Sequence, residues 1–394
     1  MVSNHRGIAL ILTLWVLAAL IVLALALGMT ARIEVQVSRN YADLIRCRWA
    51  ARAGVTAALA HVQEIAQLPW VGFEQLDQVL NASEQGIDLG DASFEVRIED
   101  EASKLNVNAF PVAALEAFFD SREIADSIID WRDKDDIPRG FGAETEYYSN
   151  LRTPYTSKNA HFDTIGELML IKGVTDQIQT DPITSDGRAL IDLLTVYSHD
   201  TNVSGEGKQR VNINTASKDE LKAELGDVLT DRDIEAIVRA RDRSNASSGG
   251  SASRRGKFKS SGELLLVRGI RREKVKQVLD RITVKDKRNL PGLINVNTAS
   301  AEVLAAVPGF DQNIAHEIVA YRNANGSFHD VGNLLDLNEI TNRAFARASD
   351  YLTTRSKVFK IISTGRSANG RSSLVITCVA DLSKGGPQIK YWQE

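Results

Sequence analysis

The strongest feature of the hydropathy pattern is an uncharged apolar run near the start of the chain. It covers Ile8 to Gly28, 21 residues without Asp, Glu, Lys or Arg. At about 1.5 Å of rise per residue, a helix of this length crosses the roughly 30 Å hydrocarbon core of a bilayer. The pattern therefore predicts a transmembrane helix from which the rest of the chain hangs.

The helical pattern continues past the membrane segment without a proline as far as Leu68. Apolar residues recur at steps of three or four, which gives the continuation one apolar face. Proline at position 69 lacks the amide donor that a helix needs, so we expect the helix to end there. The stripe comprises Val37, Tyr41, Leu44, Cys47, Ala51, Val55, Leu59 and Val62. We predict one helix of about 60 residues, half in lipid and half packed on a domain; a plain anchor with a separate amphipathic helix is the alternative.

Period-two alternation marks strands at two places that lie far apart in the sequence. Phe94 to Glu99 alternates apolar and charged residues, as a half-buried strand does. Similar runs appear only near the end of the chain, at 358–363, 374–380 and 388–392, and an Asn-Gly turn at Asn369 and Gly370 joins the first two. The pattern predicts an α+β module whose small antiparallel sheet is split by a long insertion.

The insertion contains an internal repeat. Leu105 to Asn108, Val211 to Asn214 and Ile294 to Asn297 are near copies, and the last two continue as Thr-Ala-Ser before a helix-like stretch. There a Thr or Ser side chain can cap the helix and an acidic residue can lie in its first turn. Each copy later has a Phe, at 162, 258 and 328, before a Gly-x-Leu segment. We predict three tandem helical units.

Composition argues against several classes of binding site. The chain has 394 residues, 25% of them charged, and a formal net charge of -4, so no general attraction to nucleic acid or anionic lipid is expected. Cys47 and Cys378 are too few for a disulfide scaffold or a zinc site. Two buried free thiols are the expected state, with a single bridge as the alternative.

The junction before the apolar run does not have the form of an ordinary secretory signal, which is cut after its apolar segment. Here the expected cutting point, Gly7, precedes it. Arg6, Gly7 and Ile8, with the apolar run and its amphipathic continuation, resemble the class III signal of type IV pilins and type II secretion pseudopilins. The resemblance implies that a prepilin peptidase cuts after Gly7 and methylates Ile8.

Most members of that family have Glu at the fifth mature position, which here is Leu12. This departure resembles the protein K family of minor pseudopilins, which stand at the filament tip. The family's Glu is thought to pair with the amino terminus of a neighbouring subunit. A subunit with none beyond it can dispense with a carboxylate that is costly in lipid.

The three insert units resemble helix-hairpin-helix modules. In DNA-binding members the hairpin is Gly-hydrophobic-Gly, and its backbone amides hold a phosphate. The corresponding positions here are Gly173-Val174-Thr175, Gly269-Ile270-Arg271 and Gly309-Phe310-Asp311, so the second Gly is missing each time. We therefore expect a structural, protein-contacting insert and no nucleic acid partner.

An acidic segment inside the first unit is the candidate metal site. Six carboxylates lie between Asp130 and Glu146, in a loop with Pro138 and two glycines. By residue type alone this is either a solvated acidic loop or a site for Ca²⁺, which prefers hard oxygen ligands. The segment resembles the DW-x-D-x-D-x-P and GAE-x-x-YY stretch of protein K, which implies calcium. The candidate ligands are Asp130, Asp133, Asp135, Asp136 and Glu144.

Catalysis has no support in the motifs. The six histidines form no HExxH motif, and GxSxG and Walker A patterns are absent. We expect no enzyme activity and no small-molecule substrate. The stretch Ser244 to Ser253 is rich in Ser and Gly and predicts a flexible surface loop.

These observations predict an α+β fold in which a long pilin helix lies on a small antiparallel sheet, interrupted by an all-α insert of three helix-hairpin-helix-like repeats. The expected segments are a leader at 1–7, a transmembrane segment at 8–28, its amphipathic continuation at 29–68, the sheet module at 69–104 and 356–394, and repeats at 105–200, 208–286 and 290–355.

The resemblance implies a minor pseudopilin that caps the tip of the type II secretion pseudopilus and helps to initiate its assembly, for export across the outer membrane. Its partners would be other minor pseudopilins, the major pseudopilin and the prepilin peptidase. The chain would span the inner membrane once, with its C-terminal domain in the periplasm. The alternatives are a membrane-anchored DNA receptor and a minor pilin of a type IV pilus.

Overall fold

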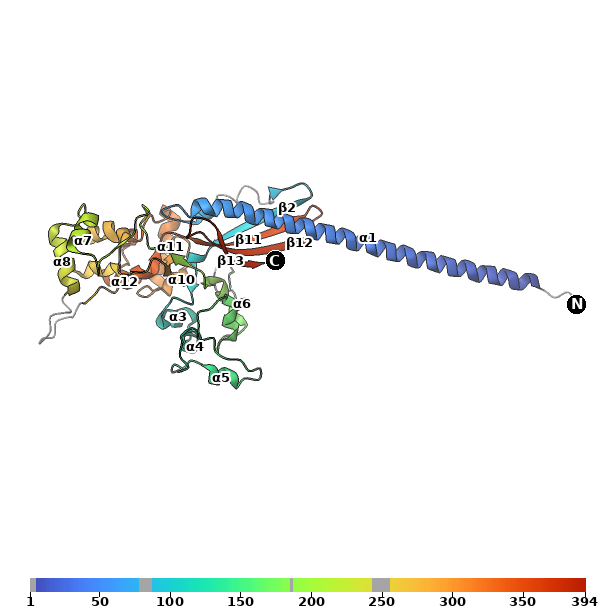
Figure 1. The fold of residues 1–394 in the computed structure, drawn as a ribbon, viewed down its shortest axis with the longest axis horizontal. Helices are drawn as coiled ribbons and strands as arrows, with labels where there is room; N and C mark the ends of the chain where they lie inside the picture. Colours follow the sequence, from blue (N-terminus) through green and yellow to red (C-terminus); the bar gives the residue numbers. More distant parts are fainter. Residues whose placement is uncertain (1–4, 78–86, 185–186, 243–255) are drawn as a thin grey trace.

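The computed structural model describes residues 5–77, 87–184, 187–242 and 256–394. One long helix, α1 (His5–Ile65), projects from a globular part built of a five-stranded sheet and a helical insert (Figure 1). The predicted α+β class is confirmed. The leader residues before His5 and the Ser/Gly-rich loop predicted at Ser244–Ser253 lie outside the described residues.

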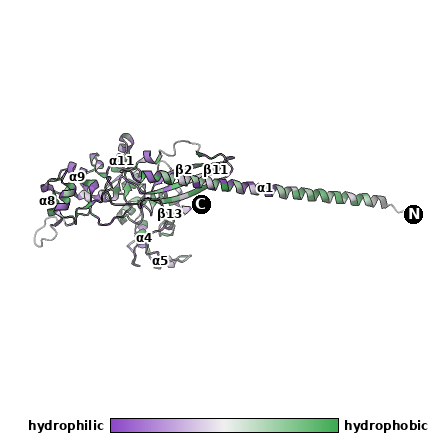
Figure 2. Cartoon of the chain, turned by 45° about the horizontal axis from the view of Figure 1, so that its top comes forward, coloured by the Kyte–Doolittle hydropathy of each residue, from purple (hydrophilic) through white to green (hydrophobic). Residues whose placement is uncertain are grey.

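The first half of α1 stands free of the globular part, and its large apolar side chains from Leu10 to Met29 are exposed (Figure 2). Leu12 has 60% of its surface exposed, although it lies within an apolar run. The part of the chain that the structure describes contains one helix long and apolar enough to cross a membrane. The helix ends at Ile65, three residues before the expected limit, in a turn that leads to Pro69.

The second half of α1 packs on an antiparallel sheet of order β1-β2-β11-β12-β13, whose strands come from two distant parts of the chain. Two glycines permit this close approach, because a Cβ on Gly365 would overlap the Cys47 carbonyl oxygen and one on Gly54 would overlap the Ser363 hydroxyl. The two cysteines are buried and free. The strands are β1 (Ile87–Asp88), β2 (Ala92–Asp100), β11 (Val358–Ser367), β12 (Ser373–Asp381) and β13 (Gln388–Gln393).

The sheet is continuous in space although its central pairing joins distant parts of the chain. Asp100, at the end of β2, pairs with Phe359 at the start of β11. The insert therefore leaves and re-enters the sheet at neighbouring points. It also has its own apolar core, separate from the one between α1 and the sheet.

The insert comprises α-helices and short 3-10 helices (η). Before and within the first unit are α2 (Phe73–Asp77), η1 (Glu101–Ser103), α3 (Val112–Phe119), α4 (Arg122–Arg132), α5 (Thr145–Ser149), η2 (Ile165–Leu170), α6 (Gln177–Thr180) and η3 (Leu190–Leu193). The second contains α7 (Lys218–Leu225), α8 (Asp231–Asp242), η5 (Ser261–Leu266), α9 (Arg272–Val278) and η6 (Leu279–Arg281). The third contains α10 (Ala301–Ala305), α11 (Gln312–Asn325), η7 (Val331–Asp336), α12 (Asn342–Ala348) and η8 (Ser349–Tyr351).

The insert is not all-α, which corrects the sequence-based expectation. In each unit the repeated Asn-containing segment forms a two-residue strand that pairs in parallel with a strand at the unit's end, so their buried backbone groups are satisfied. These pairs are β3 (Leu105–Asn106) with β4 (Leu194–Thr195), β6 (Val211–Asn212) with β7 (Ile282–Thr283), and β9 (Ile294–Asn295) with β10 (Leu352–Thr353). A fourth pair, β5 (His199–Asp200) with β8 (Leu290–Pro291), is antiparallel and links the units.

The three units also share side-chain contacts. The second Asn of each motif, at 108, 214 and 297, donates its amide to the carbonyl oxygen of the later Phe at 2.9 Å and accepts that residue's N–H. An Arg from the second helix of each unit, at 132, 241 and 322, donates to the backbone carbonyl just before this Asn. The repeated motif therefore serves internal bonding in each copy.

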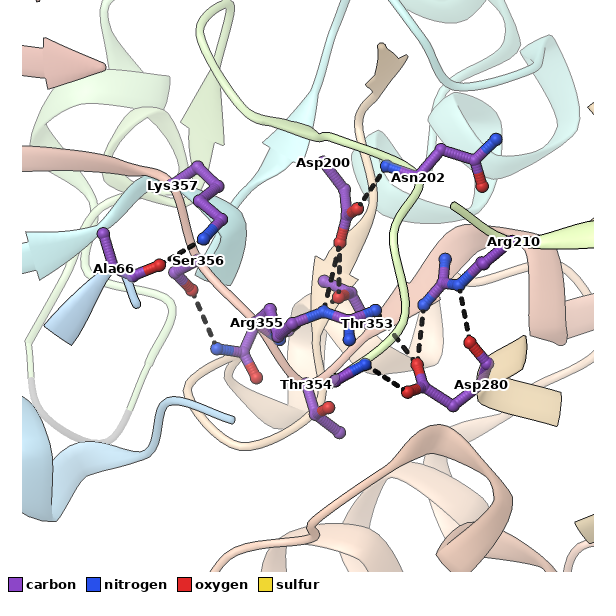
Figure 3. A network of polar contacts seen from close by, with 12 residues as sticks. Ala66, Asp200, Asn202, Arg210, Asp280, Thr353, Thr354, Arg355, Ser356 and Lys357 are labelled. Atoms are coloured by element: carbon purple, nitrogen blue, oxygen red, sulfur yellow. Dashed lines mark hydrogen bonds and ion pairs between the residues drawn. The ribbon is translucent and has the colours of Figure 1, made fainter. Parts of the chain in front are cut away.

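A buried polar network joins the insert to the sheet module (Figure 3). Arg355 Nη2 lies 3.0 Å from Asp280 Oδ1 of the second unit, and Thr353 donates to Asp200 at 3.0 Å. Burial alone would raise the pKa of Asp200, but Arg210 and Arg355 outweigh it and hold that pKa below its usual value. Lys357 donates to the Ala66 carbonyl just after α1. All three parts of the fold are thus tied together at the chain's re-entry into the sheet.

A second buried carboxylate, Asp100, receives donors from the third unit. Its Oδ2 accepts from Asn295 Nδ2 at 2.9 Å, Thr298 Oγ1 at 2.6 Å and Ser356 Oγ at 2.5 Å. Its Oδ1 accepts the Ala102 N–H at 2.7 Å. One side chain at the end of β2 therefore fixes where repeat three sits on the sheet.

Replacing Asp100 with alanine should destabilise the protein strongly, because three buried side-chain donors lose their acceptor. We expect a loss of about 3 kcal/mol in unfolding free energy, at roughly 1 kcal/mol or more per stranded donor. Thermal unfolding of the full chain in detergent would measure it. Asp91→Ala is the matched control, since the Asp91 side chain is 86% exposed beside the same strand. Equal unfolding temperatures for the two variants would contradict the role of Asp100.

Candidate functional site

The acidic segment follows α4 and folds back over the end of that helix. Ser121 caps α4 by accepting the Ile124 N–H, and the helix ends at Arg132 with Asp130 fully buried in its last turn. Gly142 lies against Asp130, where a Cβ would overlap the carboxylate. The close approach of the returning loop therefore requires glycine at this position.

Aromatic side chains hold the acidic loop against the first unit. Tyr148 is fully buried, and its ring lies edge-on to Trp131 with centroids 5.4 Å apart and stacks on Tyr155 at 5.2 Å. Its hydroxyl accepts the Lys172 N–H at 3.3 Å. The Trp131 and Tyr148 positions of the sequence motif thus supply the packing beneath the carboxylates.

Three carboxylates converge above this aromatic group. One oxygen each from Asp133, Asp135 and Glu144 lie within 4.8 Å of one another. Asp133 and Asp135 come from the turn after α4, and Glu144 from the residue before α5. The loop therefore collects ligands that are up to eleven positions apart in sequence.

Several oxygens at this place are buried and have no hydrogen-bond partner. They are Asp126 Oδ1, Asp130 Oδ1, Asp133 Oδ1, both oxygens of Glu144, and Asn159 Oδ1. Buried polar atoms are nearly always paired in folded proteins, so acceptors of this kind call for water or a cation as their partner. A cation with oxygen ligands, such as Ca²⁺, fits this donor set.

The carboxylates of the cluster are held in an unfavourable state without such a cation. Burial, with added repulsion from Asp130, Asp133 and Asp136, raises the pKa of Glu144 to about 7. Burial also raises the pKa of Asp130 to about 6, although the Arg139 N–H at 3.0 Å opposes the shift. A bound divalent cation would remove this penalty by stabilising the charged forms.

Only three of the five expected ligands lie in one close cluster. Asp133, Asp135 and Glu144 form the close group, whereas Asp130 Oδ1 lies 3.5 Å from Arg139 Nε. Asp136 instead accepts hydrogen bonds from Thr145 and Asn159. Asn159 was not predicted as part of the site; it has a left-handed backbone (φ 47°) and a buried amide oxygen without a hydrogen-bond partner.

The hairpin glycines of the three units all have positive φ, at Gly173 (84°), Gly269 (99°) and Gly309 (97°). In the third unit a Cβ on Gly309 would lie 2.6 Å from the Ala344 carbonyl oxygen, so this glycine serves helix packing. Asp311 caps α11 by accepting the Ile314 N–H at 3.0 Å. A carboxylate therefore already occupies the helix end that would face a phosphate.

Comparison with known proteins matches two parts of the insert to family models. Residues 103–181, which include the acidic loop, match the family described as type II secretion system protein K. Residues 292–353 match a helix-hairpin-helix motif, which covers the third unit. The helix-hairpin-helix assignment of the first two units stays a prediction.

Curated relatives point to the same family. A putative type II secretion system protein K of Escherichia coli K12 is 27% identical over 197 residues, 45% of this chain and 60% of that protein. Type II secretion system protein K of Aeromonas hydrophila is 24% identical over 203 residues, 44% of this chain and 61% of that protein. Across the curated relatives, the chain spans between 9% and 61% of their own lengths.

The fold has a counterpart among solved structures. A chain in the crystal structure of the GspK-GspI-GspJ complex from the type II secretion system of enterotoxigenic Escherichia coli aligns with a TM-score of 0.52. The alignment covers 91% of this chain and 98% of the other at 13% identity, so it shows a shared fold. Together with the family model over the acidic unit and the two curated relatives, it makes the chain similar to protein K of type II secretion systems over parts of its length.

Proposed function

We propose that the chain is a minor pseudopilin that caps the tip of a type II secretion pseudopilus and helps to start its assembly. The observation that carries the proposal is the match to protein K together with a free apolar helix that leads into a pilin-like sheet. The exposed apolar surface of α1 needs lipid before assembly and neighbouring helices after it. The proposed location is the inner membrane, with the globular part in the periplasm.

The proposed partners are two other minor pseudopilins, because the solved complex of similar fold contains GspI and GspJ beside GspK. The major pseudopilin would join them below the tip. Capping has two structural supports. The insert is much larger than the sheet module that carries it, and Leu12 offers no carboxylate to the amino terminus of a further subunit.

The DNA receptor alternative rests on the helix-hairpin-helix match at 292–353. The packed Gly309 and the Asp311 cap oppose phosphate binding at that hairpin. The remaining alternative, a minor pilin of a type IV pilus, shares the helix and the sheet. We favour type II secretion because the family model and both protein K relatives belong to that system.

The insert can be removed in a way that tests its role in capping. Asp100 and Phe359 are paired neighbours, so an Asn-Gly hairpin turn can replace residues 101–358 and keep the register of β2 and β11. We expect this variant to enter the membrane but to leave secretion as low as in a strain without the chain. Secreted activity and pseudopilus number would be measured in a complemented deletion strain.

Normal secretion by a stably inserted hairpin variant would overturn the capping proposal. A second variant, Leu12→Glu, restores the carboxylate that most family members carry while leaving the insert intact. This variant tests the missing carboxylate separately from the insert, because it changes residue 12 alone.

We propose that a prepilin peptidase removes residues 1–7 and methylates Ile8. The chain isolated from membranes of a host with this enzyme should then start at methylated Ile8, which intact mass and amino-terminal sequencing would measure. A bulky side chain next to the cut bond should block the enzyme, so Gly7→Leu should retain the leader. Gly28→Leu, at the far end of the same run, has open space around its Cα and should be processed normally. A mature wild-type chain beginning at Met1 would remove this assignment.

We propose that the cluster around Asp133, Asp135 and Glu144 binds Ca²⁺ and thereby fixes the acidic loop. Calcium at about 100 times its dissociation constant would stabilise the fold by about 2.7 kcal/mol. The melting temperature of the full chain in detergent should therefore rise by several degrees on addition of Ca²⁺ and fall with a chelator.

Asp133→Asn should abolish this rise, because it removes one ligand charge with little change in shape. Glu146→Gln is the matched control, since Glu146 is an exposed carboxylate in the adjoining helix. An equal calcium response in both variants, or no response in the wild type, would refute the metal site.

A further inference from the structure

The sheet face opposite α1 borders a long groove that the proposed function does not use. One hollow of about 430 Å³ lies between the end of β13 and residues 164–166 and 191–197, and a second of about 760 Å³ lies near the start of β13. Tyr197 lines both. They therefore form neighbouring halves of one groove along β13, the last strand of the sheet, which Figure 1 labels beside the C-terminus.

The two halves differ in chemistry. The first has apolar walls at Ile191, Leu194, Val379 and Tyr391, and its charged lining is balanced: Lys104 and Lys360 with Glu101 and Asp192. The second is basic, and its charged lining comprises His199, Arg288, Asp381, Lys384 and Lys390. Four basic side chains thus face one carboxylate, in a chain whose formal net charge is -4.

The single carboxylate is already neutralised. Asp381 Oδ1 lies 3.4 Å from His199 Nε2, and its Oδ2 lies 3.3 Å from Lys390 Nζ. Among the described residues, neither Arg288 nor Lys384 has an ion-pair or hydrogen-bond partner. The basic half therefore has an excess of positive charge, which favours an anionic ligand.

Strand β13 offers backbone groups beside this charge. It is the terminal strand of the sheet, and no described strand pairs with its outer edge. Its Ile389 and Trp392 side chains pair with Ala380 and Cys378, on the face of the sheet that α1 covers, and are 46% and 42% exposed. An open edge with exposed apolar residues is a template for an added strand, whose main chain gives affinity while its side chains give specificity.

We propose that this groove binds an extended acidic segment of a partner protein. The segment pairs with the open edge of β13, its carboxylates meet Arg288 and Lys384, and a large apolar side chain enters the half beside Tyr391. A polypeptide fits better than a small anion, because only a polypeptide uses the strand edge, the apolar half and the charges together. The inference does not depend on the pseudopilin assignment, so its failure would leave that assignment standing.

The test uses the full chain in detergent and a fluorescent synthetic peptide whose acidic first half is followed by alternating leucine and threonine. Fluorescence anisotropy should show binding that weakens as salt rises. The double variant Arg288→Glu/Lys384→Glu should weaken it by about tenfold or more, since charges close to a bound segment govern such complexes. A peptide with lysine for the acidic residues should not bind, and one with serine for leucine should bind less tightly.

The matched control is Lys257→Glu/Arg343→Glu, which makes the same charge changes at exposed positions outside the groove and should bind the acidic peptide like the wild type. Absence of peptide binding, or equal loss in the control variant, would overturn the proposal. Inorganic phosphate that binds as tightly as the peptide, and is lost in the groove variant, would reduce the groove to a small-anion site. Self-association that only the groove variant abolishes, without peptide binding, would make a second copy of the chain the occupant.

Discussion

The buried carboxylate of Asp100 is the interaction on which the joint between the two cores depends. A carboxylate without water is costly unless donors surround it, and here Asn295, Thr298, Ser356 and a backbone amide do so. Asn295 and Thr298 belong to the third unit, Ser356 precedes β11, and the backbone amide is that of Ala102 directly after β2. These contacts place the third unit against the end of β2, although burial still raises the pKa of Asp100 above its ordinary value. Asp200 is a second buried carboxylate nearby, and there the cations Arg210 and Arg355 stabilise its charge.

Much of this architecture follows from sequence periodicity. The uncharged run and the three-or-four spacing predict α1, and alternation predicts β2, β11 and β12. Of the predicted stripe on α1, Cys47, Ala51, Val55 and Val62 are buried, whereas Val37, Tyr41 and Leu44 lie before the sheet begins and are exposed. The repeated Asn motif predicted the three units. Its physical role, an amide that closes each unit onto its later Phe, could not be read from spacing alone, since the two partners lie between 31 and 54 positions apart.

The site was less predictable than the fold. Dense carboxylates marked the acidic loop, but their grouping depends on how it folds back over α4. Asp136 turns to Thr145 and Asn159, and Asn159 enters only because of its left-handed backbone. Likewise, Arg288 and Lys384 read as ordinary surface charges, and only the tertiary fold brings them to one groove. Side chains from separate elements meet through long-range packing, on which local patterns carry no information.

The pairing of Asp100 with Phe359 also bears on the order in which the chain folds. These residues are neighbours in the sheet but 259 positions apart in sequence, so closing that loop from an unfolded insert carries a large entropic cost. A folded insert removes most of that cost, because its own ends already lie side by side. The helical units should therefore form before the sheet closes, and β2 would spend that interval as an open edge. Until then α1 has only an incomplete surface to pack against. The packing of α1 on the sheet would therefore depend on the insert having folded first.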